Sequence, residues 1–533
     1  MTETLLTLDG VAFSLADGRP LFAGLSETFD RRRTGLVGRN GIGKTVLGRL
    51  LAGELAPSAG RVRRQGRVHR LAQQLAPEPG TTLAQLAGVH EALQALDRIE
   101  AGTGSDRDFD LLAERWDLRV RLQAELQRAG LPPLAPETPA ARLSGGQAMR
   151  VALAGAWLAD ADFLILDEPS NHLDRAGRQA LLAQLARWRG GLLVISHDRE
   201  LLETMQAIVE LSPLGLRRYG GGWRFFAECQ AQQRRDAADE LARRQLERRR
   251  ESVALQREHE RQQQRQARGR RERADGSQPK LVLDARQERS EATTGRLRRR
   301  HDTRRAELEA EVRAAAAQVV DDAAVVVPPL PPAVLPNEVL VFDGELPFVA
   351  PPLARLALVL QGATRLAVTG PNGCGKSTLL RVLAGRLAPA AGRCERRVTC
   401  AWLDQRLAEL EPSQPAIEWL RAACRQRPEA ELRTRLAQLG LGAATLGSAC
   451  GALSGGERLK LALARALLAD EPARLLLLDE PGNHLDLATL QALEAMLRGW
   501  RGALVVVSHD EAFLAALALH ERLEATPQGW RRS

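Results

Sequence analysis

The spacing of apolar and polar residues predicts short strands early in the chain and buried strands further on. Strand patterns cover residues 5–15 and 33–38. Two apolar runs follow at 163–169 (FLILDEP) and 192–198 (LLVISHD), which is typical of strands buried on both faces of a parallel sheet.

Helical patterns lie between these strands. Residues 83–101 and 109–130 carry apolar residues at helical spacing, and the turn sequence GTGSD at 102–106 separates them. Because strands and helices alternate, the chain is predicted to have an α/β fold with a mainly parallel core sheet.

The second half of the chain repeats this order of elements. Lys44 and Lys376 are 332 residues apart, and Ser144 and Ser454 are 310 apart. The copies are therefore collinear, except that the first carries about 22 additional residues (332 − 310) before its serine. We expect two similar α/β domains, called here the first repeat (1–225) and the second repeat (326–533).

The predicted linker (226–325) separates the repeats and is itself helical in pattern. Residues 228–273 and 286–319 are rich in Arg, Gln, Glu and Ala and contain no proline. The sequence ADGSQPK at 274–280 interrupts them, so we expect two helices folded back on each other. The apolar residues of the second helix keep the 4-3-4 spacing of a short coiled-coil seam: Leu308, Val312, Ala315 and Val319.

Charge is concentrated in the linker. The net charge of the chain is +9, and residues 231–320 hold 24 Lys and Arg against 16 Asp and Glu, a net of +8. No apolar run approaches the ~18 residues of a membrane span. The six cysteines form no C-x-x-C pair, which argues against a zinc ribbon or a disulfide framework. The amino terminus lacks the pattern of a secretory signal, so we expect a cytoplasmic protein without a membrane anchor.

Two glycine-rich sequences carry the first candidate chemistry. GRNGIGKT at 38–45 and GPNGCGKS at 370–377 both match a loop whose backbone N–H groups cradle a triphosphate. Lys44 and Lys376 are predicted to reach the β- and γ-phosphates. Thr45 and Ser377 are predicted to hold Mg²⁺.

Polar residues at the ends of the apolar strands complete a hydrolytic site in each repeat. A carboxylate pair can hold a metal-bound water and polarise the attacking water as a general base. A glutamine would touch the metal and that water, and a histidine would contact the γ-phosphate. The residues predicted for these roles are Asp167 and Asp479 for the metal, Glu168 and Glu480 as bases, Gln73 and Gln405, and His197 and His509.

The order of these motifs resembles the ATP-binding cassette superfamily. Each repeat has a phosphate loop, a glutamine, LSGGQ (143–147) or LSGGE (453–457), an apolar strand ending in Asp-Glu, and Ser-His-Asp. The resemblance implies that the LSGG sequence of one repeat caps the ATP held by the other, so that two ATP molecules join the repeats head-to-tail within a monomer. The residues implied to bind nucleotide are Gly38, Asn40, Gly41, Gly43, Lys44, Thr45, Gln73, Ser144, Gly145, Gly146 and Gln147, and Gly370, Asn372, Gly373, Gly375, Lys376, Ser377, Thr378, Gln405, Ser454, Gly455, Gly456 and Glu457.

Within the superfamily, the sequences EPSNHLD (168–174) and EPGNHLD (480–486) resemble family F, whose soluble tandem cassettes act on ribosomes. That family also joins its cassettes by a long basic helical hairpin, which the linker resembles. The resemblance implies that residues 228–320 approach tRNA and ribosomal RNA, and that the protein is a translation factor or protects ribosomes.

Two other functions are compatible with the same motifs. A basic helical pair attracts the phosphates of either nucleic acid, so a DNA-directed tandem ATPase is one alternative. A fused ATP-binding subunit of a membrane transporter is the other, although such a subunit needs only a short connection between its domains.

The repeats also differ at positions near the predicted sites. Gly482 replaces the Thr or Ser that is usual in the family, Gly155 stands where the second repeat has Arg465, and Leu15 occupies the position expected to stack on adenine. We therefore expect the two sites to differ in activity.

Overall fold

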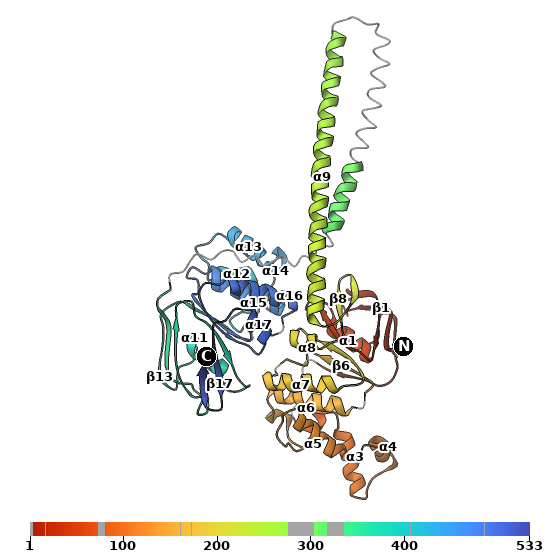
Figure 1. Ribbon diagram of the computed structural model, residues 1–533, viewed down its shortest axis with the longest axis vertical. Coiled ribbons are helices and arrows are strands. Elements are labelled where there is room, and N and C mark those ends of the chain that lie inside the picture. The colour runs from red at the N-terminus through yellow and green to blue at the C-terminus, as the bar shows by residue number, and fades with distance from the viewer. Residues whose placement is uncertain are drawn as a thin grey trace. The chain divides into compact units, whose positions relative to one another are not determined.

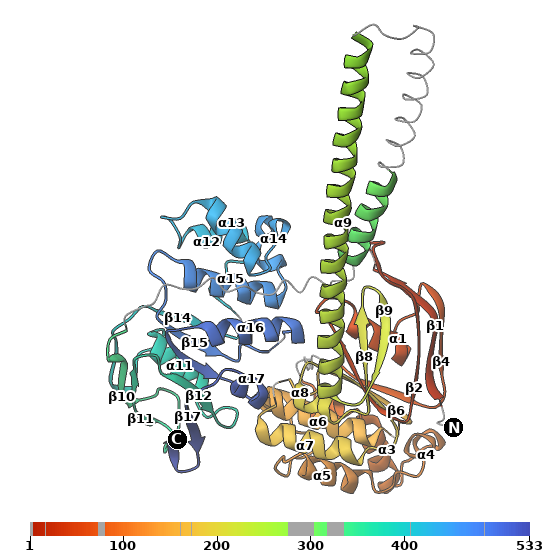
Figure 2. The same ribbon diagram turned by 45° about the horizontal axis from the view of Figure 1, so that its top comes forward.

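The computed structural model describes residues 4–15, 17–72, 80–159, 161–171, 173–274, 303–316, 335–405, 407–483 and 485–533. By internal contacts the chain divides into two compact units. One unit contains Met1–Phe226 and Asp322–Ser533, and the other is Ala227–Asp321. Figures 1 and 2 show both units in two orientations.

The first repeat contains two sheets. A three-stranded antiparallel sheet has the order β2-β1-β4, and a six-stranded sheet has the order β5-β6-β7-β3-β8-β9, parallel except for β9. The strands are β1 Thr4–Ser14, β2 Pro20–Asp30, β3 Arg33–Gly38, β4 Ala59–Arg64, β5 Val68–Leu71, β6 Phe163–Asp167, β7 Gly191–Ile195, β8 Ala207–Ser212 and β9 Gly215–Gly220.

The second repeat has the same topology. Its antiparallel sheet has the order β11-β10-β13, and its six-stranded sheet has the order β14-β15-β16-β12-β17-β18. The strands are β10 Glu338–Glu345, β11 Arg355–Gln361, β12 Arg365–Thr369, β13 Ala391–Arg396, β14 Cys400–Leu403, β15 Leu475–Asp479, β16 Ala503–Val507, β17 Glu521–Thr526 and β18 Gly529–Arg532. The predicted α/β fold with a mainly parallel core sheet is confirmed in both halves.

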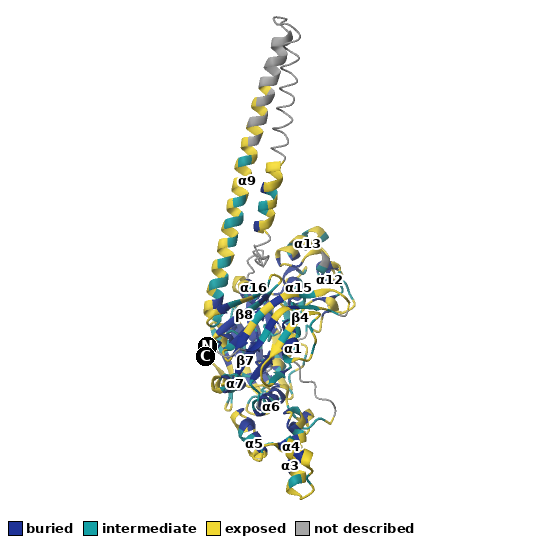
Figure 3. Ribbon diagram, turned by 90° about the vertical axis from the view of Figure 1, so that its right-hand side faces the viewer, coloured by how far each residue is buried: buried dark blue, intermediate teal, exposed yellow. Residues whose placement is uncertain are grey.

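Helices cover the parallel sheets, and this explains the uninterrupted apolar runs. Every residue of β6, β7, β15 and β16 is buried, and Figure 3 shows buried residues gathered around β7 and β8. The covering helices are α1 Lys44–Ala52, α6 Gly145–Leu158, α7 Arg175–Arg187 and α8 Arg199–Glu203 in the first repeat, and α11 Lys376–Ala384, α15 Gly455–Leu468, α16 Leu487–Gly499 and α17 Glu511–Ala516 in the second.

The segment between the glutamine and the LSGG sequence differs between the repeats and from the prediction. The two helices predicted over 83–101 and 109–130 are each broken. Gly88 has a φ of 66°, and Ala113 has a φ of 49°. Because a left-handed residue ends a helix, neither helix continues through these positions. The helices are α2 Leu83–Leu86, α3 His90–Glu100, α4 Asp106–Leu112 and α5 Leu118–Arg128, against α12 Ala416–Arg421, α13 Glu429–Gln438 and α14 Ala443–Gly447 in the second repeat.

The described part of the linker is a pair of helices. Helix α9 runs from Trp223 to Ala274, and a second helix covers residues 303–316. Two ion pairs join them. Arg244 Nη1 lies 3.0 Å from Glu311 Oε2, and Arg304 Nε lies 2.9 Å from Glu251 Oε1. As numbering rises by seven on α9 (244 to 251), it falls by seven on the partner helix (311 to 304), so the helices are antiparallel.

The predicted apolar seam of the second linker helix is partly seen. Leu308 and Ala315 are buried and Val312 is half-buried, whereas Val319 lies outside the described residues. The predicted bend at 274–280 and residues 286–302 also lie outside them, apart from Ala274. In the part of the chain that the structure describes, no helix combines the length and the apolar character needed to cross a membrane.

Candidate active sites

Each phosphate loop connects the central strand of its sheet to a helix. The first loop leaves β3 at Gly38 and enters α1 at Lys44. Gly43 caps α1 with a φ of 103°, and Gly375 caps α11 with a φ of 99°. Glycine is the residue that adopts this left-handed conformation without strain, so the N–H groups of each helix start are left pointing at the loop.

Backbone carbonyls of each phosphate loop hold the loop lysine. Lys44 Nζ donates hydrogen bonds to the carbonyls of Gly38 and Arg39 at 2.7 and 3.0 Å. Lys376 Nζ donates to the carbonyls of Gly370 and Pro371, both at 2.8 Å. Burial lowers the pKa of Lys44, whereas the carboxylates of Glu168, Asp486 and Asp167 raise it. An anion in the loop would be a stronger partner for this ammonium group than two neutral carbonyls.

The candidate metal residue of the first repeat has unused ligand capacity. Asp167 ends β6 and is 1% exposed, and neither carboxylate oxygen accepts a hydrogen bond from any described residue. Burial raises the pKa of Asp167, and the nearby Thr45 hydroxyl lowers it. Arg70 Nη1 lies 3.7 Å from Asp167 Oδ2, too long for a hydrogen bond, so the carboxylate beside Thr45 keeps oxygens that fit a divalent cation.

The second repeat has the same arrangement. Asp479 ends β15 and is buried, and burial raises its pKa while Ser377 lowers it. Gln405 is exposed, and Gln73 lies outside the described residues, so their predicted contacts with metal stay predictions.

The two candidate general bases share an unusual backbone. Glu168 has a φ of 50° and Glu480 a φ of 49°, a left-handed conformation that is uncommon for glutamate. Burial raises the pKa of Glu168 to about 8 and that of Glu480 to about 7. Carboxyl groups with pKa values near neutrality are suited to take a proton from water, and strained backbone is concentrated at functional sites.

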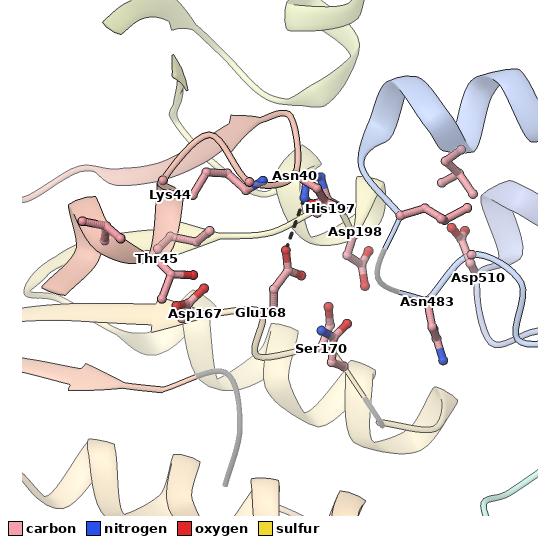
Figure 4. Close-up of a pocket in the computed structure, with 18 of the residues that line it drawn as sticks. Asn40, Lys44, Thr45, Asp167, Glu168, Ser170, His197, Asp198, Asn483 and Asp510 are labelled. Carbon is pink, nitrogen blue, oxygen red and sulfur yellow. Dashed lines mark ion pairs between the residues drawn. The ribbon is translucent and has the colours of Figure 1, made fainter. Parts of the chain in front are cut away.

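A histidine faces each glutamate. Nε2 of His197 lies 3.6 Å from Oε1 of Glu168 (Figure 4), and Nε2 of His509 lies 3.6 Å from Oε1 of Glu480. Burial lowers the pKa of His197 to about 3 and that of His509 to about 4, so both imidazoles are neutral at pH 7. Each contact is therefore between a carboxyl group and a neutral ring, too long for a hydrogen bond.

The histidines differ in their second contact. His509 Nε2 lies 3.1 Å from Oδ1 of Asn372 in its own phosphate loop. Neither ring nitrogen of His197 has a hydrogen-bond partner among the described residues. Among the described residues, the histidine is thus fixed to its own phosphate loop in the second repeat and not in the first.

A cavity of about 470 Å³ opens at the first phosphate loop. This volume is within the usual range for small-molecule sites. Residues of both repeats line the cavity, as Figure 4 shows with Lys44 and Glu168 on one side and Asn483 and Asp510 on the other. Leu15, the residue at the predicted adenine position, is also part of the wall.

Each phosphate loop also touches a carboxylate from the other repeat. Asp486 Oδ2 accepts a hydrogen bond from the Asn40 N–H at 3.0 Å, and Asp174 Oδ2 accepts one from the Asn372 N–H at 3.4 Å. These aspartates were not predicted as site residues. The sequence feature that could have identified them is their shared position as the last residue of NHLD in each repeat.

The LSGG residues form helix caps. Ser144 caps α6 in a reciprocal pair of hydrogen bonds with Gln147, and Ser454 caps α15 in the same way with Glu457. Among the described residues that line the cavity, none belongs to LSGGQ or LSGGE. The predicted contacts of these residues with ATP therefore stay predictions.

One sequence difference has a packing explanation. A Cβ atom on Gly155 would lie 2.1 Å from the carbonyl oxygen of Ala87, so α6 can approach α2 only if residue 155 is glycine. In the second repeat, the guanidinium of Arg465 lies 4.2 Å from the centre of the Trp419 ring. The Gly155–Arg465 difference thus follows from the different helices between glutamine and LSGG.

Comparisons with known proteins agree with this geometry. The family model described as "ABC transporter" matches residues 26–171 and 353–483. The chain is 34% identical over 517 residues to the tylosin resistance ATP-binding protein TlrC of Streptomyces fradiae, covering 90% of this chain and 89% of that protein. It is 30% identical to human ATP-binding cassette sub-family F member 3, covering 91% of this chain and 66% of that protein. It is 29% identical to the ATP-binding protein Uup of Escherichia coli, covering 96% and 79%.

Solved structures show the same fold. The archaeal ribosome recycling factor aABCE1, in complex with the ribosomal stalk protein aP1, matches with a TM-score of 0.58 at 18% identity, covering 98% of this chain and 89% of that chain. The structure titled "RNase-L Inhibitor" matches with a TM-score of 0.56 at 18% identity, covering 99% and 89%. At this identity the likeness concerns the fold alone.

Proposed function

The chain belongs to family F of the ATP-binding cassette superfamily and is an ATP hydrolase, and from this premise we propose that it couples two ATP sites to the ribosome and its tRNA. In this proposal the repeats 1–225 and 326–533 act as two domains, and the linker 226–325 contacts RNA. The protein acts in the cytoplasm as a monomer.

Hydrolysis is assigned to the residues at the strand ends. Lys44 and Lys376 bind the β- and γ-phosphates, and Glu168 and Glu480 take a proton from the attacking water. Mg²⁺, held by Thr45 with Asp167 and by Ser377 with Asp479, would supply positive charge to the phosphates. The buried Asp167 carboxylate accepts no hydrogen bond from the described residues and lies 3.7 Å from Arg70 Nη1, and this is the observation that supports the assignment best.

Cooperation between the repeats is supported by contacts at both phosphate loops. Asp486 and Asp174 each accept a hydrogen bond from the loop of the other repeat. Residues of both repeats also line the cavity at the first loop. We therefore propose that each ATP is bound between the repeats, with Ser144 to Gln147 capping the second loop and Ser454 to Glu457 capping the first.

The RNA-binding role of the linker is supported by its charge. Eight of the nine net positive charges lie in residues 231–320, and Arg248, Arg249 and Arg250 are exposed on α9. Arginine suits RNA because it offers paired donors to phosphate and a flat face for stacking on bases. The predicted contact residues Arg268, Arg270, Arg271 and Arg273 lie on α9, but their side chains are outside the described part, and so is Lys280.

Sedimentation with ribosomes tests the proposal. A variant with Glu168→Gln and Glu480→Gln should retain ATP and co-sediment with ribosomes when ATP is present. Replacing Arg268, Arg270, Arg271, Arg273 and Lys280 by glutamine should weaken this binding and flatten its salt dependence, because fewer counterions are released. Unchanged ribosome affinity across a salt series would show that the linker is only a spacer. Co-purification with DNA in place of ribosomal RNA would favour the DNA-directed alternative.

Protection against an antibiotic is a second candidate function, favoured by the relative named for tylosin resistance. Cells that express this chain should then tolerate more tylosin than cells that express the Lys44→Ala, Lys376→Ala variant. If both kinds of cell are equally susceptible to tylosin, the chain does not protect against it, and a role as a translation factor is the function left.

A further inference from the structure

Residue 199 follows the Ser-His-Asp sequence of the first repeat and contacts the second repeat. Arg199 Nη1 lies 2.7 Å from Oε1 of Glu494 on α16. The Arg199 side chain is 12% exposed and that of Glu494 4% exposed. A buried ion pair is costly to desolvate, and an apolar pair of similar size often serves stability as well or better. Stability alone therefore does not account for these charges.

The same guanidinium contacts the start of α9. Its central carbon lies 5.7 Å from the centre of the Trp223 ring, and Trp223 is the first residue of α9. The planar cation can bind a carboxylate at its edge and an aromatic ring at its face. Arg199 Nε and Nη2 are buried and donate no hydrogen bond to any described residue. Two donors of this group are therefore available for a different set of contacts.

Helix α8, which Arg199 begins, is also fixed to α9 at its other end. Glu203 Oε2 accepts a hydrogen bond from the N–H of Arg224 at 2.9 Å, so it caps the amino-terminal turn of α9. A Cβ atom on Gly222 would lie 2.5 Å from the Glu203 carbonyl oxygen, so the chain enters α9 in close contact with α8. Asp198, which caps α8, lines the cavity at the first phosphate loop.

Among the described residues, the second repeat has no equivalent buried pair at this position. Glu511 holds the position of Arg199. It pairs with Arg522 of its own repeat at 2.6 Å and lies 3.6 Å from Arg175 of the first repeat, and all three side chains are about one-third or more exposed. The position of Glu494 is held in the first repeat by Leu182 (494 − 312). Of these two positions, the one in the first repeat, which continues into α9, forms a buried pair with the other repeat.

We propose that Arg199 is a positioning residue that couples the pairing of the repeats at the first ATP site to the start of α9. Its guanidinium holds Glu494 of the second repeat and Trp223, the first residue of α9, at once. A shift of α16 when ATP binds displaces Arg199, and α8 carries the displacement to the amino-terminal turn of α9. The inference rests on the proposed function, because it takes ATP to alter the contacts between the repeats.

Amide hydrogen exchange of the full-length protein tests this coupling without ribosomes. The parent protein carries Glu168→Gln and Glu480→Gln, and exchange is compared with and without ATP and Mg²⁺. We expect ATP to slow exchange at residues 38–45 and 370–377 and to change it at 224–232. Adding Arg199→Leu with Glu494→Leu should abolish the change at 224–232 and retain the protection of both loops. This double variant keeps the net charge and replaces the buried pair by apolar groups, so folding is preserved.

A matched control removes the corresponding pair of the second repeat by Glu511→Leu with Arg522→Leu, and the ATP effect at 224–232 should persist. Trp223→Leu, which leaves the Arg199–Glu494 pair intact, should abolish it. An ATP effect at 224–232 that survives loss of the Arg199–Glu494 pair would overturn the inference alone. Loops that show no ATP protection in the parent would instead contradict the proposed ATP sites.

Discussion

The two repeats place the same groups at their hydrolytic sites, but different neighbours surround them. Glu168 and Glu480 have almost the same φ and the same distance to their histidines. In the second repeat His509 also contacts Asn372, whereas His197 of the first has no hydrogen-bond partner among the described residues. Duplication has thus kept the reacting groups and the topology alike, while the contacts that hold those groups have diverged.

The divergence follows the structural surroundings of each repeat. The first repeat has longer helices between glutamine and LSGG, which require Gly155 where the second repeat has Arg465. The first repeat also continues into α9, and there the Arg199–Glu494 pair, largely buried, joins it to the other repeat two residues after His197. We infer that both repeats kept the same reacting residues while the helices that pack around each site changed.

The largest expected effect comes from removing what the repeats share. Glu168→Gln with Glu480→Gln should reduce ATP turnover by ~10²–10⁴-fold, the usual contribution of a general base. Steady-state phosphate release measures the loss. Lys44→Ala with Lys376→Ala is the control, and it should lose nucleotide binding as well. Turnover at the wild-type rate in the glutamine variant would show that neither carboxylate is the base.

Exchanging the residues at 155 and 465 should destabilise the repeats unequally. Gly155→Arg places a Cβ atom 2.1 Å from a backbone oxygen of Ala87, and such overpacking costs about 3 kcal/mol. Arg465→Gly loses the contact with Trp419 and gains helix flexibility, for a cost of about 1–2 kcal/mol. Denaturant unfolding measures both. A Gly155→Arg protein as stable as the wild type would refute the packing explanation.

Removal of the capping aspartates should instead affect the repeats alike. Asp174 caps α7 through the Gly177 N–H, and Asp486 caps α16 through the Thr489 N–H. Alanine at either position should lower the free energy of unfolding by ~1 kcal/mol, the usual value of such a cap. A difference of several-fold between the two variants would show that the aspartates do not have equivalent structural roles.

The smallest effect concerns pH. Because a general base acts in its deprotonated form, turnover rises with pH through its pKa. Burial raises the pKa of Glu168 to about 8 and that of Glu480 to about 7. The rising limb of kcat/KM should therefore lie at higher pH in Glu480→Gln, which retains Glu168, than in Glu168→Gln. If the rising limbs of the two variants coincide or lie in the reverse order, the two glutamates do not differ in pKa in this way.

Much of the fold and the site could be predicted from sequence because the signals are local. A glycine-rich loop, an apolar run ending in Asp-Glu and a following Ser-His-Asp are each contiguous, and each occurs twice in the same order. The duplication made every assignment more specific than one motif would be. The strands of both parallel sheets and the helical character of the linker followed from the same periodicity.

The remaining features depend on contacts between distant residues or on backbone shape. The Arg199–Glu494 pair joins residues 295 positions apart, and neither position carries a motif. Ala113 ends a predicted helix with a left-handed φ that no glycine or asparagine signals. From the sequence, Gly155 is a sign that the two sites differ in activity. The structure shows that glycine is needed at 155 because the Ala87 backbone lies so close. Such features require the packed structure.

The central claim is that two similar sites contribute unequally to ATP hydrolysis, and the single variants Glu168→Gln and Glu480→Gln test it most directly. Their steady-state ATP turnover is compared at pH 7 with that of the wild type. His509 is fixed to its phosphate loop by Asn372, whereas His197 has no hydrogen-bond partner among the described residues. We therefore predict that Glu480→Gln loses more turnover than Glu168→Gln. Equal losses within error, or a larger loss in Glu168→Gln, would contradict the account.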